Sequence, residues 1–224
     1  MLHLPDLVSE IAHLKALHVS DCDLRELPHD LSNLGMLETL KLQNNPRLHT
    51  VPDTLGQLAS LKHLEIVGSG VRALPAMHGL ANLEHLAIQH SPLTSLPRDI
   101  GNARKLKTLS LAHTYLREVP ASIGNLSKLT ELDLRHNVGL TSVPDSIGQL
   151  RQLKTLDLSY CPQLRAVPAS VETCATSRPS ICVAARVLPC KVCRNRSSPR
   201  CPAARCTSRN ICTPKSARYV KNGR

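Results

Sequence analysis

Three histidines recur at a fixed spacing in the middle of the chain: His90, His113 and His136 are each 23 residues apart. If each occupies the same place on neighbouring strands of a parallel sheet, they form a column with a spacing of about 4.8 Å. Stacked imidazoles could chelate a metal ion, or repel one another when protonated and so respond to pH. We favour the simpler interpretation of a recurring polar surface position and expect no metal.

Acidic side chains gather in the same part of the sequence. Glu131 and Asp133 lie in one 23-residue period and Asp157 in the next, with Arg135 two residues after Asp133. Such a cluster is either a docking patch for a basic partner or ordinary solvated surface.

The sequence contains none of the common catalytic signatures. We find no phosphate-binding G-x-x-x-x-G-K-[ST], no zinc-binding H-E-x-x-H, no nucleophile-bearing G-x-S-x-G and no G-x-G-x-x-G. The sequence therefore predicts a non-enzymatic protein that needs no cofactor and takes no small-molecule substrate.

The C-terminal segment, residues 172–224, differs from everything before it. It holds 12 Lys and Arg against one Asp or Glu, which is the whole net charge of +11, and seven of the nine cysteines. Cys190-x-x-Cys193 with Cys201 and Cys206 could form a zinc knuckle, although the segment has no histidine. The arginines could instead form a nucleic-acid-binding arm, with only Tyr219 available for stacking.

We favour a third interpretation of this tail, namely that it is an out-of-frame translation of repeat-coding DNA. Composition, charge and periodicity all change within a few residues of Val171. A polar, strongly charged segment cannot offset the entropy of ordering, so we expect disorder. We accordingly expect no nucleic acid as a partner and no membrane.

The elements that position the histidines and carboxylates are clearest from Leu129 to Leu150, in LTELDLRHNVGLTSVPDSIGQL. The pattern L-x-x-L-x-L-x-x-N predicts a short strand with Leu132 and Leu134 on its inner face, and the proline-containing second half predicts a return arc. This is a leucine-rich repeat. Full units of 22 to 24 residues begin at Leu14, Leu37, Leu61, Leu83, Leu106, Leu129 and Leu153.

The predicted fold class is α/β, a solenoid with a parallel β-sheet on its concave side and irregular, 3-10 or short helical segments on its convex side. Residues 1–13 form a partial repeat, 14–171 the seven units and 172–224 the tail. The chain has no Phe or Trp, so the core must be aliphatic. The ninth residue of each unit is small and polar, and we expect it to point inward and satisfy backbone groups; these residues are Cys22, Asn45, Ser69, Ser91, Thr114, Asn137 and Cys161.

Protein binding is expected on the concave face, through the side chains that the strands leave exposed. The candidates are His18, Lys41, Gln43, His63, Glu65, His85, Gln89, His90, His113, Glu131, Asp133, Arg135, His136, Asp157 and Tyr160. Residues 1–171 carry 16 basic and 16 acidic side chains, so this face has no excess charge that would favour nucleic acid.

The units LKTLSLAHTYLREVPASIGNLSK and LTELDLRHNVGLTSVPDSIGQLRQ resemble those of type III secreted effectors of plant-pathogenic bacteria, of the XopL, XopAE (HpaF) and PopC kind. The resemblance covers residues 4 to about 171. It implies recognition of a host plant protein inside the host cell, and in XopL-like effectors a separate C-terminal domain is a ubiquitin ligase without a catalytic cysteine.

Nothing after Val171 resembles that ligase domain, and nothing before Leu4 resembles a secretion segment. We therefore expect a truncated or frameshifted effector that acts as a monomer, with a fragment of an E3 ubiquitin ligase and a basic-tailed nucleic-acid-binding protein as the alternatives. The sequence has neither a conventional secretory signal nor an apolar run long enough for a membrane helix. If the effector interpretation fails, a cytoplasmic protein is expected.

Overall fold

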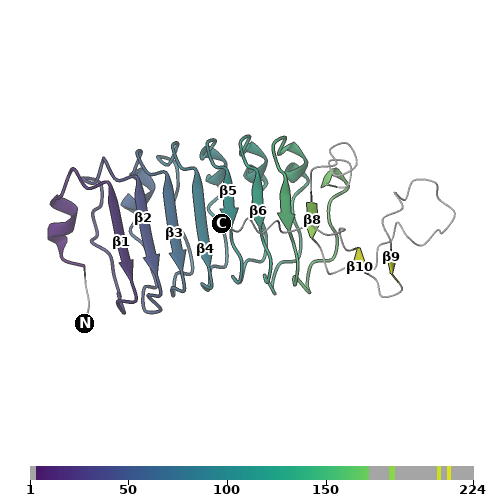
Figure 1. The fold of residues 1–224 in the computed structure, drawn as a ribbon, viewed down its shortest axis with the longest axis horizontal. Helices are drawn as coiled ribbons and strands as arrows, with labels where there is room; N and C mark the ends of the chain where they lie inside the picture. The colour runs from purple at the N-terminus through teal and green to yellow at the C-terminus, as the bar shows by residue number, and fades with distance from the viewer. Residues whose placement is uncertain (1–3, 172–181, 185–205, 208–210, 213–224) are drawn as a thin grey trace, which may run out of the picture.

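The computed structural model describes residues 4–171 and three short segments beyond them, 182–184, 206–207 and 211–212. Its main feature is one parallel sheet whose strands follow one another in chain order along the long axis of the molecule (Figure 1). The strands of the seven repeats are β1 Ala16–Ser20, β2 Thr39–Gln43, β3 His63–Val67, β4 His85–Gln89, β5 Thr108–Ser110, β6 Glu131–Asp133 and β7 Thr155–Asp157. The predicted parallel-sheet solenoid is confirmed.

The register of the sheet is set by the repeat itself. Each residue pairs with the residue at the same place in the next unit, as in Leu40 with Leu64 and Leu109 with Leu132. Because side chains alternate across a strand, this register collects the leucines in one row on the inner face and the polar side chains in rows on the outer face.

The core is a continuous stack of aliphatic side chains. Leu, Ile and Val from every unit are buried in a single cluster, with Met77, Ala103 and Cys161 as the few other contributors. No single unit can cover this apolar face, so each is stabilised by lying on its neighbours. Leu17 in β1 is only partly buried, because the first full repeat has just one complete neighbour.

The return arcs contain 3-10 helices on the side opposite the strands. They are η1 Asp6–Glu10, η2 Asp53–Gln57, η3 Ile100–Asn102, η4 Ala121–Asn125 and η5 Asp145–Gln149. Four of the five directly follow a proline, which fixes φ and removes a backbone donor where no partner strand is needed. The unit from Leu61, which is one residue short, forms turns here instead of a 3-10 helix.

Three short strands lie within the segment predicted to be disordered. β8, Cys182–Ala184, pairs in parallel with β7, and β9, Cys206–Thr207, pairs antiparallel with β10, Ile211–Cys212. The rest of residues 172–224 lies outside the described residues, so the disordered tail and its out-of-frame origin stay predictions.

Candidate functional site

The candidate site is the outer face of the sheet, where the strands present side chains in rows across the repeats. One row runs through the middle of the strands and contains His18, Lys41, Glu65, Ala87, Ser110, Asp133 and Asp157, each paired in register with the next. Most of these side chains are half-buried because their neighbours flank them on both sides. The sheet therefore fixes their order and spacing.

The N-terminal half of this face is held by a charged network. Lys41 Nζ lies 3.2 Å from a carboxylate oxygen of Glu65, and Gln43 Nε2 donates a hydrogen bond of 2.9 Å to the same group. These three side chains come from two adjacent strands, and the two charges cancel. This half of the face is polar but carries no net charge beyond the histidines.

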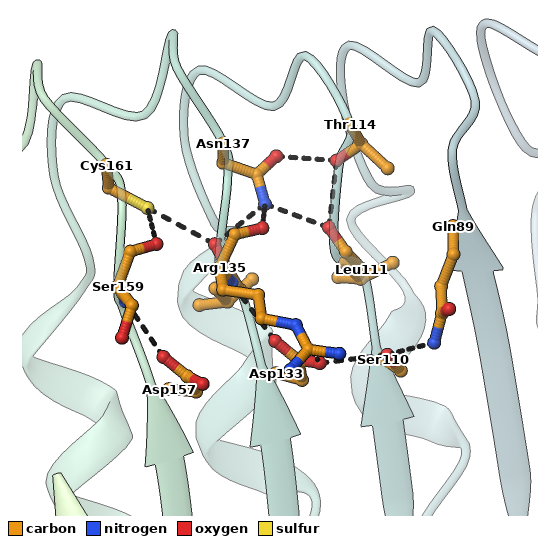
Figure 2. Close-up of polar contacts among 11 residues, drawn as sticks. Gln89, Ser110, Leu111, Thr114, Asp133, Arg135, Asn137, Asp157, Ser159 and Cys161 are labelled. Carbon is orange, nitrogen blue, oxygen red and sulfur yellow. Dashed lines mark hydrogen bonds and ion pairs between the residues drawn. The ribbon is translucent and has the colours of Figure 1, made fainter. Parts of the chain in front are cut away.

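The C-terminal half carries a longer chain of contacts over four repeats (Figure 2). Gln89 Nε2 donates to Ser110 Oγ at 2.6 Å, and Ser110 Oγ in turn donates to Asp133 Oδ2 at 3.4 Å. The Arg135 side chain pairs with Asp133 at 3.3 Å, and its backbone N–H donates to the other carboxylate oxygen. Asp157 accepts from the backbone N–H of Ser159 at 2.9 Å.

Three carboxylates therefore share this half of the face with one guanidinium. Glu131, Asp133 and Asp157 stand against Arg135, which leaves a net charge of −2 if the histidines are neutral. The predicted acidic cluster is thus assembled on two neighbouring strands, although Arg135 neutralises one of its members directly.

Two histidines in the centre of the face, His63 and His85, lie on adjacent strands with their rings stacked. The ring centroids are 4.6 Å apart, and His85 Nδ1 lies 2.6 Å from the hydroxyl of Thr108. Burial, and then the charge of His63, lower the pKa of His85. Both rings are therefore neutral hydrogen-bonding groups at pH 7 in this arrangement.

Ion pairs flank the sheet just before the strands. Glu38 meets Lys62 at 2.8 Å and Glu84 meets Lys107 at 2.5 Å. The hydrogen bond from the lysine is the main cause of the lowered pKa of each carboxyl group. These pairs are solvent-exposed, so they define the register of neighbouring units more than they stabilise them.

A second column of side chains follows the strand ends and forms a rim. Its seven members all have left-handed backbones, with positive φ: Asp21, Asn44, Gly68, His90, His113, His136 and Tyr160. Gly, Asn, Asp and His tolerate this conformation best, which accounts for the residue types found there. We expected these residues within the concave face, but they lie just past the strands, where the chain turns away.

Four rings of this column stack face to face. The centroids of His90 and His113 are 4.3 Å apart, those of His113 and His136 are 4.1 Å apart, and those of His136 and Tyr160 are 4.3 Å apart, with interplanar angles of 10–15°. We call these four residues the aromatic ladder. Burial lowers the pKa of His113, and its two histidine neighbours lower it further.

This stacking is unfavourable for a shared metal ion. The lone pairs of an imidazole lie in the ring plane, so parallel stacked rings point them side by side instead of toward one centre. In the described part of the chain, no group of three or more His, Cys, Asp or Glu residues is arranged to hold a metal ion. The ladder is therefore a surface feature and not a ligand set.

The ninth residues of the repeats point inward, as predicted, and satisfy the backbone where the strands end. The Asn45 amide donates to the carbonyl oxygens of Val19 and Gln43, and its Oδ1 accepts from the Leu24 N–H. Asn137 repeats this pattern (Figure 2).

The two cysteines at the same place have the structural role we expected. Cys161 is buried, its thiol donates to the Leu134 carbonyl oxygen, and burial raises its pKa. Cys22 donates to the carbonyl oxygen of Ser20. Both thiols therefore complete the row of inward-pointing polar groups.

Some predicted features fall outside the described residues. The zinc-knuckle cysteines Cys190, Cys193 and Cys201 and the basic arm cannot be placed, and of Cys206 only the backbone of β9 is described. In residues 4–171 and the short strands beyond, none of the helices has the length and apolar character required to cross a bilayer.

Comparison with known proteins agrees with the fold. Residues 68–164 match the family described as leucine-rich repeat region, and residues 13–34 match the leucine-rich repeat family. The leucine-rich repeat domain of the type III effector XopL is similar in structure, with a TM-score of 0.66 and 24% identity over 82% of this chain and 72% of that one. A leucine-rich repeat protein of Leptospira interrogans gives a TM-score of 0.62 and 26% identity over 83% and 53%.

Among curated proteins, the transforming growth factor beta activator LRRC33 of Danio rerio is 34% identical over 90 residues. That match covers 40% of this chain but only 13% of the relative. The fold, a stack of parallel strands with a polar outer face, defines the class of non-catalytic interaction scaffolds. This chain is a leucine-rich repeat protein.

Proposed function

We propose that this protein binds a protein partner on the outer, concave face of its sheet and performs no catalysis. The observation that carries the proposal is the preorganised rows of polar side chains, which lateral contacts such as Gln89–Ser110–Asp133 hold in place before any partner arrives. Side chains that are already ordered lose little conformational entropy on binding.

The partner that we propose is a host plant protein, and the protein that we propose is the recognition part of a type III effector. The effector-like repeat pattern and the structural similarity to the XopL repeat domain support this proposal. The protein would then be delivered into the host cell by a type III system and act there as a monomer.

Site-specific photocrosslinking tests where the partner binds. A photoreactive amino acid replaces Gln43 or Ser110 on the outer face, and in matched variants it replaces the exposed convex residues Gln57 or Gln149. We expect one protein from plant cells to be crosslinked from both outer-face positions and from neither convex position. Equal crosslinking from the two sides of the solenoid, or capture of nucleic acid instead of protein, would contradict the proposal.

A further inference from the structure

The aromatic side chains of this protein are concentrated on its surface and not in its core. The chain has three tyrosines and no Phe or Trp, and two of those tyrosines lie along the rim. Tyr115 is 58% exposed and Tyr160 48%, and the apolar Val138 beside them is 49% exposed. Gly139, next to Val138, lies against the backbone of Tyr115. An aliphatic core does not need these side chains, so their position calls for another explanation.

The aromatic ladder next to them is a rigid element. Its rings are stacked on one another, and their backbones are fixed by sheet hydrogen bonds, since the N–H groups of His90, His113 and His136 each donate to the carbonyl oxygen of a residue in the following repeat. The stack presents ring edges to solvent. A neutral imidazole edge carries one nitrogen that accepts hydrogen bonds.

The charge beside the ladder is negative at neutral pH. The carboxylates of Glu131, Asp133 and Asp157 outnumber the guanidinium of Arg135, whereas the N-terminal half of the face pairs Lys41 with Glu65 and has no such excess. Asp133 is close enough to His113 to influence its titration. The exposed aromatic side chains and the acidic excess therefore meet over the same repeats.

We propose that the rim formed by the aromatic ladder, Tyr115 and Val138 is a docking surface, together with the carboxylates of Glu131, Asp133 and Asp157, for an extended arginine-bearing segment of a partner protein, and that mild acid releases this segment. This inference rests on the proposed function, because the segment belongs to the protein bound by the outer face.

Arginine fits this surface better than other side chains do. Its planar guanidinium pairs with carboxylates in a fixed geometry, stacks on aromatic faces such as that of Tyr115, and donates to imidazole nitrogens. From His90 to Tyr160 the ladder spans roughly 13 Å, the length of about four residues of extended chain. Alternate side chains of such a segment would face the carboxylates.

The response to acid follows from the groups around the ladder. His113 faces His90 and His136 on the two neighbouring turns, and Arg135 and Asp133 from the next strand. Burial and these like charges keep its imidazole neutral at pH 7. Below about pH 6 the histidines gain protons, so the surface becomes cationic and repels arginine.

The test is a binding titration of the full chain with a fluorescein-labelled peptide of five Arg-Ser repeats, followed by anisotropy. We expect the double variant Tyr115→Ala/Val138→Ala, and separately Asp157→Asn, to raise Kd by about tenfold. The matched controls are Met36→Ala, an exposed apolar residue away from the rim, and Asp53→Asn on η2. Both should change Kd less than about twofold.

The pH arm replaces His90, His113 and His136 together by asparagine, which tolerates the left-handed backbone. Lowering the pH from 7.5 to 5.5 should weaken binding to the wild-type chain by about tenfold and leave the triple variant nearly unaffected. The proposal is overturned if rim and control variants behave alike, or if a Glu-Ser peptide binds as tightly as the Arg-Ser peptide. Circular dichroism of each variant excludes misfolding as the cause.

Failure of this proposal is distinguishable from failure of the proposed function. If the outer-face crosslinks form but the rim variants bind the peptide normally, only the rim inference is wrong. If the rim binds the peptide but no partner is crosslinked from Gln43 or Ser110, the proposed function fails instead.

Discussion

Asn137 is the polar side chain on which the interior of the solenoid depends most. It is fully buried, and its amide donates to the carbonyl oxygens of Leu111 and Leu134, both at 2.8 Å. Its Oδ1 lies 2.5 Å from the hydroxyl of Thr114 and accepts from the Leu116 N–H at 3.2 Å. The change to test is Asn137→Ala.

The expected loss can be worked out from what each partner retains. The carbonyl oxygen of Leu111 still accepts from Thr114, and that of Leu134 still accepts from the Cys161 thiol. The Leu116 N–H, in contrast, loses its side-chain acceptor inside the core. One unpaired buried donor costs about 1–3 kcal/mol, and the weakened bonds and the small cavity add to it. We expect a loss of about 3 kcal/mol in the free energy of unfolding.

Thermal unfolding followed by circular dichroism measures this loss. For a chain of this length about 3 kcal/mol corresponds to a decrease of roughly 6–12 °C in Tm. The matched control is Asn102→Ala, where the same amide is removed from an exposed position in η3, and it should leave Tm within about 2 °C. If both variants melt at the same temperature, the inward-pointing ninth residue does not stabilise the solenoid as argued here.

Three further predictions concern packing, thiol chemistry and pH. Gly124→Ala should destabilise the chain by about 1–3 kcal/mol in urea unfolding, because a Cβ there would lie 2.7 Å from a backbone carbonyl oxygen, whereas Gly35→Ala, with open space around it, should be neutral. Iodoacetamide at pH 8 should alkylate Cys22 well before Cys161, whose thiol is buried and has a raised pKa; peptide mass mapping would show the order. Because folding lowers the pKa of His113, the unfolded chain binds more protons below about pH 6.5, so stability should fall as the pH drops through that value. His113→Asn should reduce the pH dependence of the urea midpoint.

The architecture was predictable because it depends on one short-range rule applied seven times. Leucines at alternating strand positions, such as Leu132 and Leu134, must share a face, and a 23-residue period must bring equivalent residues into register. The inward role of Asn45 and Asn137 was equally accessible, since a strand that turns away inside a core leaves backbone groups in need of partners. Tolerance of the one-residue insertions and of the shortened unit follows from their position in turns.

The detail of the rim was not accessible in the same way. The period of 23 residues predicts that His90, His113 and His136 form a column, but it does not give the side-chain rotamers that place their rings face to face. It also places these residues in the strands, whereas a left-handed backbone turns each of them past the strand end. The column contains Asp, Asn, Gly and three His, which are the residue types that adopt positive φ most readily, so this composition was the available signal.

Tyr160 shows why the ladder is better explained by surface contact than by local conformational preference. A bulky aromatic residue is a poor choice for a left-handed backbone, and its φ of 57° is therefore strained. What this residue contributes is its ring, stacked on His136 with a centroid distance of 4.3 Å and still 48% exposed. Asparagine at this position, as at Asn44, would satisfy the backbone at less cost. The strain is therefore offset by the ring contact and by whatever the exposed ring binds. Tyr160→Asn should accordingly leave Tm unchanged or slightly raised while weakening binding of the Arg-Ser peptide, and an equal loss of both would indicate that the ring serves only the fold.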